Sequence, residues 1–147
     1  PDFLKDPKNK DLKSKISYAA LLGGINVGNA STCLPHRLQQ AIGSVPSIHQ
    51  PHAMGLAAIY PAWAKEVYQY RSEKIETLKI HLGKKNKEID FIEEFIEKIG
   101  VKNKLSSYNV KKNDINIFIK NISGNLENDP IKFKDKKLFE KIYQDSF

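Results

Sequence analysis

Residues 30–63 read ASTCLPHRLQQAIGSVPSIHQPHAMGLAAIYPAW and carry three of the chain's four histidines beside a run of small apolar side chains. Pro35 suits the first turn of a helix, and Gly43 suits the end of one. We therefore predict a short helix from about residue 34 to residue 42. His36 then lies in the first turn of this helix.

A longer helix is predicted directly after it. The segment SVPSIHQP, residues 44–51, contains two prolines and predicts a loop. The next segment, HAMGLAAIYPAWAKEVYQYR, predicts a long helix that begins at His52 and kinks near Pro61, because proline removes a backbone hydrogen bond. His36 and His52 are thus predicted at the starts of two consecutive helices.

The flanking sequence continues the helical pattern in both directions. Upstream, residues 12–29 predict a helix in which Gly23 and Gly24 suit the close approach of another backbone. Downstream, residues 72–83 and 86–100 place isoleucine, leucine and phenylalanine at helical spacing, and each segment ends at a glycine.

The last third of the chain adds two shorter elements. NDINIFIKNIS, residues 113–123, fits a helix or a strand, and we favour a helix because its apolar residues follow the helical period. Residues 132–147 predict a final helix that groups Leu138, Phe139, Ile142 and Tyr143. The predicted fold class is therefore all-α, a multi-helix bundle.

Composition excludes several classes of protein. The 147 residues suit a single domain, and the net charge of +7 raises the question of nucleic-acid binding. Only Arg37 and Arg71 are arginines, and the lysines are scattered among acids, so we predict a solvated surface and no nucleic-acid partner. The N-terminus lacks a signal-peptide core and no apolar run is long enough for a membrane span, which predicts no membrane association.

The single cysteine, Cys33, excludes an internal disulfide and fits a reducing, cytoplasmic setting. We expect it to be a buried structural residue, since a thiol nucleophile needs an activating base beside it.

The histidines suggest metal binding without establishing it. Neutral imidazole is the commonest side-chain ligand for divalent transition metals, but a tight site normally needs three or four protein ligands. From spacing alone, ordinary polar contacts and a metal site both remain open for His36, His49 and His52.

A resemblance narrows these alternatives. HRLQQAIG, a short loop and then HAMGLAAIYPAW resemble the metal-binding signature of the iron-containing alcohol dehydrogenases. ALLGGINVGNAS, before it, and residues 95–130, after it, resemble further segments of that family. The likeness covers essentially the whole chain.

The resemblance implies that residues 1–147 are part of an all-helical, metal-binding C-terminal domain. In the family this domain packs against an N-terminal domain that binds NAD or NADP, and that domain is absent from this chain. The family's metal is usually Fe²⁺ and sometimes Zn²⁺, held by one aspartate and three histidines. Residues 1–35 contain no histidine, so the family's upstream Asp-x-x-x-His pair is not found here.

Matching the signature residue by residue assigns candidate site residues. His36 corresponds to the family's second metal histidine, and His52 to the third, because it lies nine residues before Pro61. His49 is the alternative to His52. Gln40 stands where many members have a histidine near the substrate, so its amide is expected in the substrate pocket.

The implied activity is metal-assisted hydride transfer between a small alcohol or aldehyde and a nicotinamide cofactor. The chain would contribute ligands and a pocket wall, and by itself it would be inactive without the N-terminal domain or a partner chain that supplies it. The alternative is a non-catalytic helical interaction module derived from the same family. Homo-oligomer formation is left open by the sequence.

Overall fold

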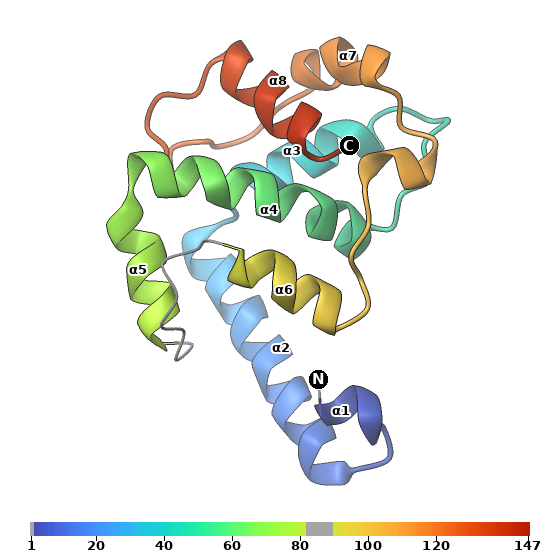
Figure 1. Cartoon of the computed structure of the whole chain (residues 1–147), viewed down its shortest axis with the longest axis vertical. Coiled ribbons are helices and arrows are strands. Elements are labelled where there is room, and N and C mark those ends of the chain that lie inside the picture. The colour runs from blue at the N-terminus through green and yellow to red at the C-terminus, as the bar shows by residue number, and fades with distance from the viewer. Residues whose placement is uncertain (1, 82–89) are drawn as a thin grey trace. The chain divides into compact units, whose positions relative to one another are not determined.

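The computed structural model describes residues 2–81 and 90–147, and the chain divides after Thr32 into two compact units, residues 1–32 and 33–147. All regular secondary structure in the described residues is helical (Figure 1), which confirms the predicted all-α class. The division after Thr32 was not predicted from the sequence, which suited a single domain.

The first unit consists of α1 (Asp2–Lys5) and α2 (Lys10–Ala30). Asn9 caps α2, since its side-chain oxygen accepts hydrogen bonds of 3.1 Å from the backbone N–H groups of Asp11 and Leu12. Within the described residues, a Cβ at Gly23 or Gly24 would meet no atom within 4 Å.

The second unit is built around α4 (His52–Tyr70), which packs against four other helices: α3 (Leu34–Gly43), α5 (Ser72–His81), α6 (Phe91–Lys98) and α8 (Lys136–Asp145). α7 (Ile115–Lys120) packs against α3 and α8, and two short 3₁₀ turns precede it, Leu105–Tyr108 and Lys112–Asp114. In Figure 1, α4 lies across the middle of this unit.

One hydrophobic core joins the helices of the second unit. Its fully buried side chains come from segments far apart in the sequence: Leu34, Leu38 and Ile42 of α3, Ile59 and Val67 of α4, Leu105, Phe118, Ile131, Ile142 and Tyr143. The hydroxyl of Tyr143 on α8 donates a 2.8 Å hydrogen bond to the backbone oxygen of Leu38 on α3. These contacts hold α3 against α8.

Most predicted helix boundaries are confirmed. α3 ends at Gly43 and α4 begins at His52, as predicted, and α4 continues through Pro61 as a single helix. Residues 115–120 form a helix rather than a strand, and Leu138, Phe139 and Ile142 are buried on α8.

The apolar faces of α5 and α6 were predicted less well. Ile75 is buried, but Leu78 is exposed and Lys79 is buried instead, where its ammonium pairs with Glu76 at 3.1 Å. On α6, Phe91 and Ile96 are buried whereas Phe95 is exposed. The predicted contributions of Leu82, Gly83 and Ile89 lie outside the described residues.

Among residues 2–81 and 90–147, no helix combines the length and the apolar character needed to traverse a bilayer.

Candidate metal centre

The first turns of α3 and α4 bring His36 and His52 together. Their ring centroids are 5.2 Å apart and the ring planes are inclined by 49°. Each histidine lies where the sequence predicted it, at the start of its helix, and the loop of residues 44–51 allows the two helix starts to meet. His36 is half-buried and His52 is exposed, so the pair is accessible from outside the unit.

Gln39 holds the His52 ring from the side of α3. Its oxygen, Oε1, lies 2.5 Å from Nδ1 of His52, and only 5% of Gln39 is exposed. Sequence analysis did not select Gln39, although its position three residues after His36 places both side chains on one face of α3.

Burial, the neighbouring His52 and the Arg37 guanidinium, in that order, lower the pKa of His36. All three disfavour an added proton on the ring. They therefore favour neutral imidazole, which is the form that binds a transition metal.

His49 and Gln40 are the other two candidates. His49 is exposed in the loop before α4, whereas the ring of His36 contacts the ring of His52. Gln40 is exposed, and its side-chain oxygen accepts a 3.2 Å hydrogen bond from Nη1 of Arg37.

A buried carboxylate outside the histidine segment fixes the start of α3. Asp129 is 5% exposed, and its Oδ2 accepts hydrogen bonds from the backbone N–H of Leu34 at 2.9 Å and from Nε1 of Trp63 at 3.0 Å. Its Oδ1 accepts from the backbone N–H of Ile131 at 2.9 Å. Sequence analysis missed Asp129 because an Asn-Asp-Pro segment reads as an ordinary turn.

Cys33 lies at the N-cap of α3 and is half-buried, less buried than expected. Burial and the negative charge of Asp129 raise the pKa of its thiol to about 11, despite a hydrogen bond with the Tyr60 side chain. Burial and the neighbouring Cys33 raise the pKa of the Tyr60 hydroxyl to about 12. Cys33 is therefore a protonated neighbour of the site at neutral pH and not a nucleophile.

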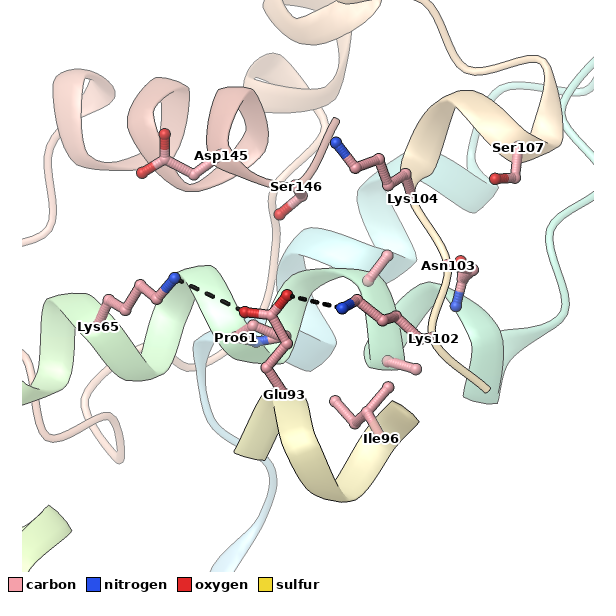
Figure 2. Close-up of a pocket in the computed structure, with 12 residues that line it drawn as sticks. Pro61, Lys65, Glu93, Ile96, Lys102, Asn103, Lys104, Ser107, Asp145 and Ser146 are labelled. Atoms are coloured by element: carbon pink, nitrogen blue, oxygen red, sulfur yellow. Dashed lines mark ion pairs between the residues drawn. The ribbon is translucent and has the colours of Figure 1, made fainter. Parts of the chain in front are cut away.

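Elsewhere in this unit, α4, α6, the segment 102–107 and the end of α8 enclose a pocket of about 380 Å³. Figure 2 shows Glu93 between Lys65 and Lys102, with which it forms ion pairs of 3.8 Å and 3.4 Å. His36, His52 and Gln40 do not line this pocket.

The donor set at the histidine pair fits part of a transition-metal site. Two adjacent imidazoles can supply two ligands. The side-chain amide of Gln50 is buried beside Gly55, and neither its oxygen nor its nitrogen is hydrogen-bonded within the described part of the chain. No group of three or more His, Cys, Asp or Glu side chains that could hold a metal occurs among those residues. The pair therefore needs further ligands.

The second unit thus presents two adjacent imidazoles at the starts of two consecutive helices. The family described as "Fe-containing alcohol dehydrogenase family, C-terminal" matches residues 1–147. The chain belongs to this family.

Two relatives show how much of such a protein the chain represents. It is 30% identical to the long-chain primary alcohol dehydrogenase AdhA of Thermoanaerobacter ethanolicus, over 100% of this chain and 40% of that protein. It is 29% identical to the probable NADH-dependent butanol dehydrogenase 2 of Bacillus subtilis (strain 168), over 75% of this chain and 31% of that protein. The chain thus spans less than half the length of these relatives, and no solved structure matches it.

Proposed function

We propose that this chain is the C-terminal helical portion of an NAD(P)-dependent alcohol dehydrogenase and that His36 and His52 are two ligands of its catalytic metal. The contact between the two rings, in a chain that belongs to the iron-containing alcohol dehydrogenase family, carries the proposal. The remaining ligands and the nicotinamide site come from the N-terminal part of the protein or from a partner chain.

The chemistry follows from the residues. When bound, a divalent ion, Fe²⁺ or Zn²⁺, acts as a Lewis acid that polarises the oxygen of an alcohol or aldehyde during hydride transfer to or from the nicotinamide. His36 and His52 supply neutral nitrogen ligands. Gln40, exposed on α3 one turn after His36, offers its amide to a substrate hydroxyl or to water.

The relatives support this activity at the level of the reaction class. Both are named as alcohol or butanol dehydrogenases, and one is named as NADH-dependent. The substrate of the present protein is therefore proposed to be an alcohol or aldehyde.

The test is metal content and turnover of the native protein that carries this chain, in three single variants. His36→Ala and His52→Ala should each reduce bound metal, measured by inductively coupled plasma mass spectrometry, and abolish oxidation of alcohols followed by nicotinamide absorbance. His49→Ala is the matched control and should retain both. Loss of metal in His49→Ala with retention in His52→Ala would overturn the ligand assignment.

A further inference from the structure

We propose that Gln39 is a positioning residue that selects which ring nitrogen of His52 is free to bind a metal. A neutral histidine carries one ring proton, and the hydrogen bond made by one nitrogen decides the state of the other. The oxygen of Gln39, 2.5 Å from Nδ1, can only accept a hydrogen bond. Nδ1 therefore holds the proton, and Nε2 keeps its lone pair for a ligand bond.

The position of Gln39 suits this role. It lies one turn after His36, on the same face of α3, and reaches across to the first residue of α4. Because Gln39 is 5% exposed, water competes little for its amide oxygen. One side chain of α3 thus connects the helix that carries the first histidine to the ring of the second.

Gly55 provides the space through which Gln39 reaches His52. A Cβ at Gly55 would lie 2.6 Å from Cγ of Gln39 and 2.5 Å from Oε1 of Gln50, both closer than real Cβ contacts. Gly55 is 3 residues after His52, so it faces α3 on the same side of α4. A larger residue at Gly55 would displace Gln39 from the ring.

The hydrogen bond between Gln39 and His52 is a feature of the structure, whereas its effect on metal binding rests on the proposed function. Hydrogen-bond partners of metal-binding histidines typically change metal affinity about 10–100-fold when they are removed. A glutamine that only stabilised the fold would not determine which nitrogen of His52 carries the proton. The location of that proton therefore distinguishes a structural role from a positioning role.

The first measurement uses the metal-free native protein. Gln39→Met keeps the length of the side chain and removes the acceptor, whereas Gln39→Glu keeps an acceptor oxygen. Long-range ¹H–¹⁵N spectra should place the ring proton of His52 on Nδ1 in the unmodified protein and in Gln39→Glu. In Gln39→Met the proton should be distributed between the two nitrogens. An unchanged His52 spectrum in Gln39→Met would overturn the proposal.

The second measurement is the dissociation constant for Zn²⁺, obtained by competition with a chromophoric chelator. Gln39→Met should weaken binding at least about tenfold, and Gln39→Glu should restore it to within a few-fold of the unmodified protein. Gln144→Met, on the exposed surface of α8, is the matched control and should leave the constant unchanged. Equal zinc affinities for the Gln39→Met and Gln144→Met variants would overturn the proposal.

Two further variants distinguish failure of the Gln39 proposal from failure of the proposed function. If Gln39→Met does not fold, Gly55→Ala serves in its place, because the added Cβ displaces Gln39 while leaving its amide intact. His52→Ala reports on the proposed function itself. If it leaves the zinc constant unchanged, His52 is not a ligand and the proposed function fails, whereas the ring-proton result stands by itself.

Discussion

The Asp129 carboxylate accepts hydrogen bonds from the backbone of Leu34 and Ile131 and from the Trp63 indole, in a position that is 5% exposed. Removing it leaves three donors without their acceptor in the interior, and each unsatisfied buried donor costs about 1–3 kcal/mol. The start of α3, two residues before His36, depends on one of these bonds.

Asp129→Ala is therefore expected to lower the free energy of unfolding by at least about 3 kcal/mol, which urea denaturation followed by circular dichroism would measure. Glu127→Gln changes an exposed acid of the same turn and should leave the midpoint unchanged. Equal midpoints for the two variants would show that the Asp129 bonds contribute little.

A second prediction concerns the thiol of Cys33. Its pKa is raised to about 11, so at pH 8 the folded protein holds about a hundredfold less thiolate than a thiol with its ordinary pKa of 9.0. The rate of alkylation by iodoacetamide should rise about tenfold per pH unit from 7 to 10 in the folded protein, because the pH stays below the raised pKa.

In urea the increase should slow near pH 9, where an exposed thiol with its ordinary pKa of 9.0 is half ionised, and the rate should level off above that pH. Mass spectrometry of quenched samples gives both curves. A plateau near pH 9 in the folded protein would contradict the raised pKa.

At the residue level, the sequence located side chains that occur within one recognisable segment and missed those that act from outside it. His36 and His52 could be placed because their spacing and helix starts are local properties. Asp129 contacts Leu34 across 95 positions in the chain, so no local pattern indicates it. Gln39 and Gly55 could be recognised only when the distance between α3 and α4 was known.

Among the elements, α4 and α8 are joined by an ion pair between a buried acid and a half-exposed lysine. Glu66 is 4% exposed, and its carboxylate lies 2.5 Å from the ammonium of Lys141. Hydrogen bonding to Glu66 raises the pKa of Lys141. The lysine therefore stays charged, and its loss would leave a carboxylate without its partner between two helices.

Lys141→Met is expected to lower the free energy of unfolding by about 1–2 kcal/mol, because a buried polar group loses its partner. Chemical denaturation would measure the change, and Lys137→Met, an exposed lysine on the same helix, is the control. The double variant Glu66→Met Lys141→Met should recover part of the loss, since two apolar groups replace the pair. No recovery would mean that the carboxylate is not the source of the cost.

The boundaries of the helices could be predicted from the sequence more reliably than the faces that the helices bury. Proline, glycine and capping residues mark where α3 and α4 begin and end, and these signals are local. Which residues of α5 and α6 are buried depends on their neighbours, so Phe95 is exposed and Lys79 is buried against the simple apolar pattern. Tertiary contacts decide those faces.

At the level of the whole molecule, α2 presents apolar side chains without a buried residue of its own. Leu21, Leu22 and Ile25 are exposed by 58%, 43% and 49%. Contiguous exposed apolar surface favours association. The polypeptide of residues 1–147 should therefore form larger species as its concentration rises, which sedimentation velocity would detect.

The double variant Leu21→Glu Ile25→Glu should shift this equilibrium toward the monomer, because it places charge on one face of α2. Ser14→Glu Asn26→Glu adds the same charge at exposed polar positions and should leave association unchanged. A monomer at every concentration in the unmodified polypeptide would contradict the prediction.

The long sequence separation of the contacts that hold α3 also sets an order of events during synthesis. Residues 36 and 52 leave the ribosome well before Asp129 and Tyr143, whose bonds to Leu34 and Leu38 span 95 and 105 positions. Contacts of this range form only when the distant partner is available, and chains are made from the N-terminus. The nascent protein therefore exposes both imidazoles before Asp129 and Tyr143 are available to hold α3 in place.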